Sequence, residues 1–181
     1  MSSKMLLLKD ISVKAQQNFL ILEDNPDINE MIIEGLKHMG FCGNFYQAFT
    51  INDAKKEIQN HNIDYILSDW NLPDGQGVQL LKAVRKSVNF QGLPFVMITA
   101  NSDVDSMLES SKLGVSAYLV KPFTIEQLQE KVVEGWKHNE ATAKEIIKFL
   151  KTQLQEKELL IEKLTKENLK LKALIEKSSI A

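Results

Sequence analysis

Short apolar runs alternate with segments of helical periodicity between residues 18 and 138. The apolar runs are FLIL, NFYQAF, DYILSD, PFVMITA and SAYLVKP, of which NFYQAF is the weakest strand candidate. Because most of them are continuously apolar, we expect strands that are buried on both faces. Strands that alternate with amphipathic helices predict a parallel sheet between two helical layers, joined by right-handed crossovers.

Capping residues mark the ends of the expected helices. Asn25 is suited to an N-cap position and Pro26 to the first helical turn. Thr50 with Asp53 three residues later resembles a capping start for the next helix. Further helix boundaries are expected at or near Gly40, Asn60, Gly77, Asp103, Leu113 and Thr124.

The pattern changes after Asn139, where glycine and proline disappear and Lys, Glu and Leu dominate. A heptad frame places Ile147, Leu154, Ile161, Asn168 and Ile175 at position a, and Leu150, Lys157, Leu164, Leu171 and Ser178 at position d. Branched residues at a with Leu at d favour a parallel two-stranded coiled coil, and Asn168 would set its register. Lys157 is a defect in this seam, and a solvated single helix or a helix folded back onto the domain stays open.

Length and composition fit one globular domain with an extension. The chain has 181 residues, of which 44% are hydrophobic. We expect a leader over residues 1–17, a domain over 18–138 and a coiled-coil helix over 139–181.

Charge and cysteine content narrow the function classes. The net charge is −2, and no basic block precedes the heptads, so direct DNA binding is not expected. Cys42 is the single cysteine and makes no internal disulfide, which fits a cytoplasmic protein. The N-terminal run MLLLKDISV is too short to span a bilayer, so no membrane segment is expected.

Polar residues stand where the apolar runs end. Asp69 ends the third run, and the turn residues Asn71, Pro73, Asp74, Gly75 and Gly77 follow it. The other run ends carry Glu23 with Asp24, Thr99, and Lys121. In a parallel sheet these positions converge on one edge, where ligands bind. Three carboxylates there repel one another and favour Mg²⁺, and a carboxylate can attack phosphorus to give an acyl phosphate.

The segments SDWNLPDGQG and AYLVKPF resemble the matching motifs of CheY-like receiver domains of two-component response regulators. The resemblance covers about residues 18–138, with the motifs in order and at strand ends. It implies an α/β fold with a doubly wound, five-stranded parallel sheet, which the long C-terminal helix would follow.

The resemblance also implies a role for each acidic residue. Asp69 would be the phosphorylated aspartate. Glu23 and Asp24 would hold Mg²⁺ or Mn²⁺ together with Asp69 and the backbone carbonyl of Asn71. Asn71 and Asn101 would flank the water that attacks the phosphoryl group during dephosphorylation.

The remaining implied roles concern the phosphoryl group and the switch. Lys121 would contact the phosphoryl group, next to a cis bond to Pro122. Thr99 would be the switch hydroxyl, with Ala100 beside it, and Tyr118 the rotating aromatic. Taken singly, Glu23 with Asp24 would be a helix-capping pair, Thr99 a strand-end cap, Tyr118 a core aromatic and Lys121 a solvated cation. Their joint occurrence favours the phosphoryl site.

We therefore expect a regulator that accepts a phosphoryl group from a sensor histidine kinase and has no separate catalytic domain. It would signal to a separate downstream protein as a homodimer held by the C-terminal coil. One alternative is a phosphorelay intermediate or phosphate sink. Another is a fragment of a longer regulator whose output domain follows the coil.

Overall fold

The computed structural model describes residues 16–100 and 111–178, without the side chains of residues 141–150, 152–153 and 170–178. Most of the expected leader and the first part of the helix expected from Asp103 lie outside the described residues. The chain divides into two compact units between Glu140 and Ala141.

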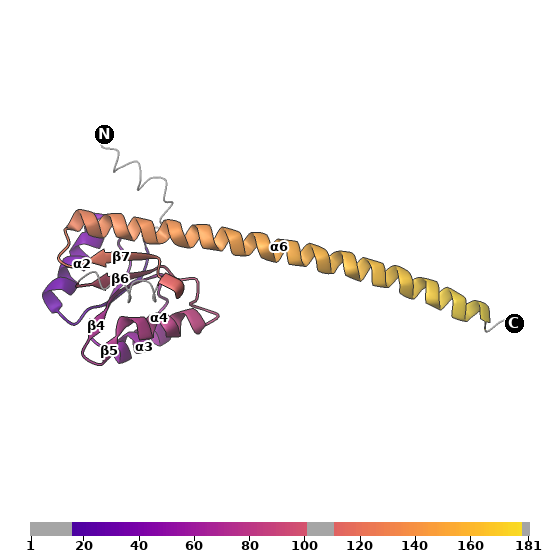
Figure 1. Ribbon diagram of the computed structural model, residues 1–181, viewed down its shortest axis with the longest axis horizontal. Coiled ribbons are helices and arrows are strands. Elements are labelled where there is room, and N and C mark those ends of the chain that lie inside the picture. Colours follow the sequence, from indigo (N-terminus) through magenta and orange to yellow (C-terminus); the bar gives the residue numbers. More distant parts are fainter. Residues whose placement is uncertain (1–15, 101–110, 179–181) are drawn as a thin grey trace, which may run out of the picture. The chain divides into compact units, whose positions relative to one another are not determined.

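A five-stranded parallel sheet forms the centre of the first unit (Figure 1). Its strand order is β2-β1-β3-β6-β7. The strands are β1 (Phe19–Leu22), β2 (Phe45–Ala48), β3 (Tyr65–Asp69), β6 (Phe95–Thr99) and β7 (Ala117–Val120). Asp69 pairs in register with Ile98, and Thr99 with Val120, so the strands end along one edge. The predicted doubly wound α/β fold is confirmed.

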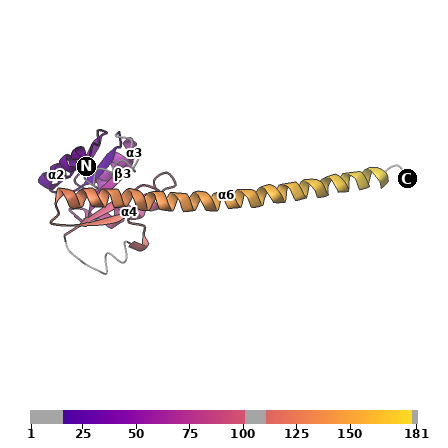
Figure 2. The same ribbon diagram turned by 90° about the horizontal axis from the view of Figure 1, so that it is seen from above.

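Helices cover both faces of this sheet (Figure 2). They are α2 (Pro26–His38), α3 (Ile51–Asn60), α4 (Gly77–Lys86) and the first turns of α6 (Ile125–Ser178). Leu20 and Leu22 of β1 pack with α3 and α4. Phe19 and Ile21, which point the opposite way along the same strand, pack with α2 and α6. The continuous apolar runs of the sequence therefore contribute side chains to two hydrophobic cores, one on each face of the sheet.

The helix starts follow the capping residues of the sequence. The Asn25 side chain accepts hydrogen bonds from the N–H groups of Asp27 and Ile28. At the start of α6, the Thr124 N–H donates to the Gln127 side chain and the Gln127 N–H donates to the Thr124 hydroxyl. This reciprocal pair is a capping box, which fixes where α6 begins.

The segment of turn residues behind Asp69 has secondary structure of its own. It contains a small antiparallel hairpin of β4 (Asn71–Leu72) and β5 (Gly75–Gln76). Gly75 has φ +146°, a conformation that side chains with a Cβ rarely adopt. We call residues 71–76 the hairpin. A segment this short has too little periodicity for the sequence to reveal its strands.

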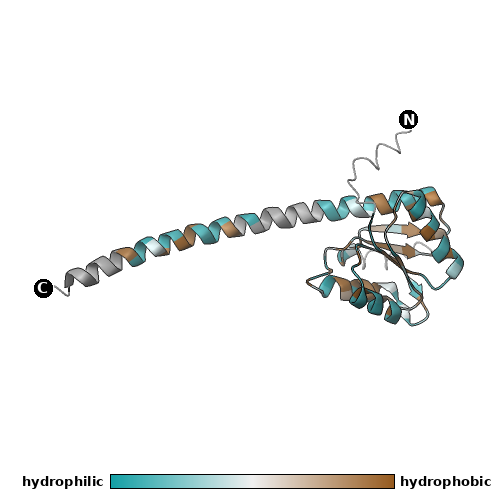
Figure 3. Ribbon diagram, turned by 180° about the vertical axis from the view of Figure 1, so that it is seen from behind, coloured by the Kyte–Doolittle hydropathy of each residue, from teal (hydrophilic) through white to brown (hydrophobic). Residues whose placement is uncertain are grey.

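Helix α6 supplies the whole helical part of the second unit, from Ala141 onward. Figure 3 shows hydrophobic and hydrophilic residues alternating along the described part of this unit. Its exposed apolar side chains are Leu154, Leu159, Leu160, Ile161, Leu164 and Leu169. Within the described residues, no helix combines the length and apolar character needed to cross a membrane.

Candidate functional site

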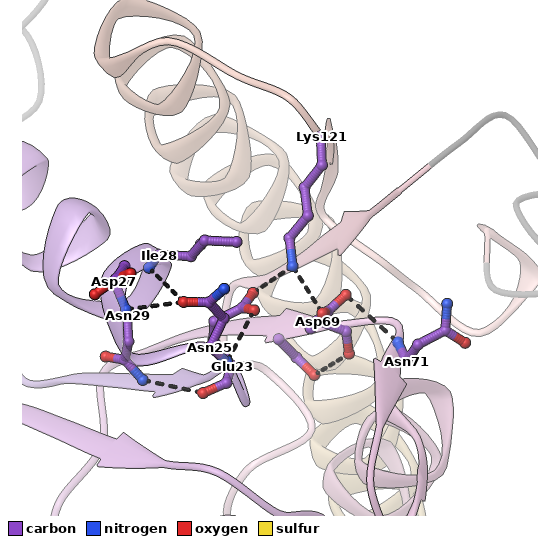
Figure 4. Close-up of polar contacts among 9 residues, drawn as sticks. Glu23, Asn25, Asp27, Ile28, Asn29, Asp69, Asn71 and Lys121 are labelled. Atoms are coloured by element: carbon purple, nitrogen blue, oxygen red, sulfur yellow. Dashed lines mark hydrogen bonds and ion pairs between the residues drawn. The ribbon is translucent and has the colours of Figure 1, made fainter.

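The carboxyl edge of the sheet gathers the polar residues that the sequence placed at the strand ends. Glu23 follows β1, Asp69 is the last residue of β3, Thr99 is the last residue of β6, and Lys121 follows β7. All except Lys121 are buried. Three of these residues lie together in Figure 4, where the Lys121 side chain reaches toward Glu23 and Asp69.

Lys121 forms ion pairs with both buried carboxylates. Its Nζ lies 2.6 Å from Glu23 Oε2 and 2.7 Å from Asp69 Oδ2. The side chains of Glu23 and Asp69 are only 1% and 8% exposed. The carboxylate that ends the buried strand β3 is therefore stabilised by a partly buried cation from the end of β7, which lies two strands away in the sheet.

Burial and charge shift the titration of this group of residues. Desolvation raises the pKa of Glu23, with a smaller opposing effect of the Lys121 ammonium and a further rise from the Asp69 carboxylate. Burial by itself would lower the pKa of Lys121, but its hydrogen bonds to Asp69 and Glu23 outweigh this, so the pKa is raised. Lys121 is thus held as a cation against the two carboxylates.

Asp24 completes an acidic cluster with Glu23 and Asp69. One carboxylate oxygen from each residue lies within 4.8 Å of the others. Asp24 is exposed, whereas the other two are buried. The donor set consists of oxygen atoms alone, with a net negative charge that Lys121 offsets only in part. It fits a hard divalent cation such as Mg²⁺.

Backbone contacts fix the loop that carries Asp69. The Ser68 hydroxyl donates to the Asp69 carbonyl at 3.0 Å, and the Gly77 N–H donates to the Trp70 carbonyl at 2.8 Å. A Cβ at Gly77 would collide with the Asp69 carbonyl oxygen and the Ser68 hydroxyl. The chain can fold back onto the end of β3 only because residue 77 is glycine.

Asn71 lies beside Asp69 and contacts it through the backbone. Its N–H donates to Asp69 Oδ1 at 3.4 Å, and in Figure 4 its side chain points away from that carboxylate. On the other side of the site, the buried Asn29 amide of α2 donates to the Glu23 carbonyl at 3.3 Å. The first contact orients the Asn71 backbone at the end of β3, and the second attaches α2 to the end of β1.

The remaining residues named from the sequence lie on β6, β7 and their following loops. Thr99 is buried, and its carbonyl accepts a hydrogen bond from the Lys121 N–H at 2.7 Å. Ala100 is exposed, Tyr118 is half-buried on β7, and the Lys121–Pro122 peptide bond is cis. Asn101 lies outside the described residues.

Two contacts of the site were not anticipated from the sequence. The first is the ion pair of Lys121 with Glu23, because the sequence analysis assigns Glu23 to the metal and Lys121 to the phosphoryl group. The Asp74 carboxylate accepts hydrogen bonds from the first residues of α3. The sequence indicates only a turn residue at this position, and no local pattern links Asp74 to a helix that precedes it in the chain.

Comparison with known proteins places these features in a family. The response regulator receiver domain family matches residues 19–133. Chemotaxis protein CheY of Pseudomonas aeruginosa is 35% identical over 113 residues, which is 62% of this chain and 90% of that protein. Chemotaxis protein CheY-3 of Vibrio cholerae is 34% identical over 113 residues, which is 62% of this chain and 86% of that protein.

Solved structures agree with this assignment. The chemotaxis response regulator CheY4 of Vibrio cholerae superposes with a TM-score of 0.61 at 27% identity, covering 66% of this chain and 98% of that chain. A CheY-like receiver domain protein from Methanospirillum hungatei gives a TM-score of 0.62 at 26% identity, covering 70% of this chain and 98% of that chain. The chain belongs to the family of response regulator receiver domains.

Proposed function

We propose that Asp69 accepts a phosphoryl group from a phosphohistidine of a sensor histidine kinase. The observation that carries this proposal is the pairing of Asp69 with Lys121 inside an acidic cluster, at the carboxyl edge of the sheet. In the transfer, an Asp69 carboxylate oxygen forms a bond to phosphorus as the phosphorus–nitrogen bond breaks. The imidazole nitrogen leaves with the electron pair of that bond and takes up a proton from water.

The chain's own residues position this reaction and balance its charge. Lys121 already lies 2.7 Å from the attacking carboxylate and would pair with an oxygen of the phosphoryl group. Glu23, Asp24, Asp69 and the Asn71 carbonyl would hold Mg²⁺. When bound, Mg²⁺ neutralises charge on the transferring phosphoryl oxygens. The protein contribution is mainly positioning, since the reactive phosphorus comes from the partner.

The phosphorylated state would be read through β6 and β7. Thr99 ends β6 next to the site, and Tyr118 lies on the neighbouring strand, where it pairs in register with Met97. A phosphoryl group at Asp69 adds charge and acceptor oxygens, which the Thr99 hydroxyl and Ala100 N–H would satisfy. The resulting shift of Thr99 and Tyr118 would change the surface around β7 as a change in population between two states.

The second unit would hold two copies of the chain together. Leu154, Ile161 and Leu164 are exposed on one helix and share the a and d positions of the heptad frame, with Asn168 at the next a position. The seam residues Ile147, Leu150, Leu171 and Ile175 lie on the same helix, outside the described side chains. In this frame Glu167 at g precedes Lys172 at the following e position, which suits pairing between parallel chains. A second copy of the chain therefore fits this surface, and a separate downstream protein would receive the signal.

Phosphorylation is tested by incubating the chain with Mg²⁺ and a histidine kinase or acetyl phosphate, and measuring intact mass. We expect one added phosphoryl group in the wild-type chain and none in Asp69→Asn. A phosphorylated Asp69→Asn chain would refute the assignment of the acceptor. Two further measurements distinguish a signalling receiver from a phosphorelay intermediate. One is the lifetime of the phosphorylated state, and the other is transfer of the phosphoryl group to a histidine phosphotransfer protein.

Assembly is tested by light scattering with and without Mg²⁺ and beryllofluoride, a mimic of the phosphoryl group. A dimer under both conditions would indicate a constitutive coil whose output geometry is switched. A dimer only with the mimic would indicate that phosphorylation controls assembly. A monomer under both conditions would refute the homodimer.

A further inference from the structure

Asp74 connects the hairpin behind Asp69 to the start of helix α3. One carboxylate oxygen accepts from the Ile51 N–H at 2.8 Å, and the other accepts from the Asn52 N–H at 3.1 Å. The first N–H groups of a helix have no partner within the helix, and the helix dipole favours a negative charge there. Asp74 therefore caps α3 from a segment more than twenty residues later in the chain.

The same end of α3 also has a local cap. The Thr50 hydroxyl accepts from the Asp53 N–H at 3.1 Å, and Thr50 itself is the N-cap residue. Thr50 contacts only its own helix in this way, whereas Asp74 joins the helix to the hairpin. Both residues thus accept hydrogen bonds from N–H groups at the start of α3, but only Asp74 connects this helix to the hairpin.

The hairpin depends on contacts outside itself, and Leu72 supplies one of them by packing against the hydrophobic core. Each of its strands has two residues, with Asn71 paired to Gln76 and Leu72 paired to Gly75. A two-stranded hairpin is marginally stable even when it is longer than this one. Asp74 lies in its turn, so the two hydrogen bonds to α3 hold the end of the hairpin that is farthest from β3.

The base of the hairpin lies directly on the candidate site. Asn71 begins β4 and donates its N–H to Asp69 Oδ1. Its carbonyl is the backbone ligand that the proposed function assigns to the divalent cation. A carbonyl in a mobile segment would have to be ordered when the cation binds, which weakens binding.

We propose that Asp74 is a positioning residue of the phosphorylation site, which holds the Asn71 backbone in place for the divalent cation. The proposal rests on the proposed function, because it concerns the same cation. Asp74 would act through hydrogen bonds alone, because both of its carboxylate oxygens accept from N–H groups at the start of α3. Asp74 would thus tie the start of α3 to the metal-binding backbone.

The first test uses the metal-free chain and compares Asp74→Ala with Thr50→Ala. Both variants remove an acceptor from the start of α3, but only Asp74→Ala detaches the turn of the hairpin from that helix. We expect faster amide hydrogen exchange in the first turn of α3 in both variants, and faster exchange over residues 70–77 in Asp74→Ala alone. Equal exchange over residues 70–77 in the two variants would overturn the proposal.

The second test measures Mg²⁺ affinity by calorimetry in the full chain. Loss of an outer contact that orients a metal ligand typically weakens affinity by about tenfold or more, which we expect for Asp74→Ala. Thr50→Ala should bind Mg²⁺ like the wild type, and Asp74→Asn, which keeps one acceptor oxygen, should fall between the wild type and Asp74→Ala. Asp74→Asn also serves as the informative variant if Asp74→Ala does not fold.

The outcomes separate this inference from the proposed function. If the wild-type chain binds Mg²⁺ and is phosphorylated while Asp74→Ala binds Mg²⁺ as tightly, only the positioning role fails. If Thr50→Ala weakens Mg²⁺ binding as much as Asp74→Ala, Asp74 is a helix cap and nothing more. If the wild-type chain neither binds Mg²⁺ nor accepts a phosphoryl group, the proposed function and this inference fail together.

Discussion

Lys121 is the shared counter-ion of the buried Glu23 and Asp69 carboxylates. In Lys121→Met, the Glu23 and Asp69 carboxylates would lose their shared counter-ion while Glu23 stays almost fully buried. Removing one partner of a buried ion pair typically costs about 3 kcal/mol or more. We expect a loss of about that size in the free energy of unfolding, measured by urea denaturation at pH 7 with a chelator present.

A second substitution identifies the cause of this loss. Glu23→Gln removes one of the two buried charges that Lys121→Met leaves without a partner, the more deeply buried one. The double variant should therefore be more stable than Lys121→Met alone, and the double-mutant cycle should be strongly non-additive. Additive losses would show that Lys121 and Glu23 contribute independently and that their ion pair is not the reason for the instability.

Gly77 is the residue whose replacement should disturb the loop behind Asp69 most directly. A methyl group there would meet the Ser68 hydroxyl and the Asp69 carbonyl, and the carbonyl is backbone that cannot move away without shifting β3. Overpacking of this kind typically costs about 1–3 kcal/mol, so Gly77→Ala should be destabilised by that amount and phosphorylated more slowly. Gly92→Ala is the matched control, because no atom lies within 4 Å of a Cβ at that position. Similar behaviour of the two variants would contradict the packing argument.

At the scale of elements, Tyr65 joins the sheet to α6. Its hydroxyl is buried and donates to the Val132 carbonyl at 3.0 Å, and its ring lies 5.1 Å from that of Trp136. In Tyr65→Phe this hydrogen bond is lost, which typically costs about 1 kcal/mol. We expect a corresponding drop in the free energy of unfolding at pH 7, and a smaller one for Tyr46→Phe on the edge strand β2.

The same residue predicts a pH dependence. Burial raises the pKa of the Tyr65 phenol well above its ordinary value, and the Glu134 carboxylate adds to this rise. The stabilisation by the neutral phenol is therefore fully present below the unfolded-state pKa of about 10 and is lost as the pH rises toward the folded-state pKa. Urea titrations from pH 7 to pH 11 should show the wild type losing more stability than Tyr65→Phe above about pH 10. Parallel curves would contradict the assignment.

The sequence alone predicts the elements that are determined by neighbouring residues. It does not predict the features that depend on residues far apart in the chain. The five strands and the starts of α2, α3 and α6 follow from apolar runs and from capping residues such as Asn25 and Thr124. The convergence of Glu23, Asp69 and Lys121 followed from the parallel sheet. The hairpin and the contact of Asp74 with α3 did not, because two-residue strands carry no periodicity and Asp74 caps a helix that lies earlier in the chain.

At the scale of the whole molecule, the two units divide the proposed function between them. The first unit carries the family fold and the candidate phosphorylation site, and residues after 133 lie outside the family match. The second unit is one helix with exposed apolar residues. Under the proposed function, a coil between two copies of the second unit would bring two phosphorylation sites into one assembly.

The heptad frame makes a sharp prediction for this assembly. Leu164 falls at position d and is 49% exposed, whereas Leu159 falls at position f and is 69% exposed. In a seam that buries Leu164, replacing it with Glu removes apolar contacts and buries a charge, which should cost at least about 2 kcal/mol per chain. A dimer carries two such replacements, so association should weaken by roughly 700-fold or more. Light scattering over a range of concentrations should therefore show Leu164→Glu as a monomer where the wild type is a dimer. Leu159→Glu adds the same charge outside the seam and should keep the wild-type mass, so equal dissociation of both variants would place the contact surface on another face of α6.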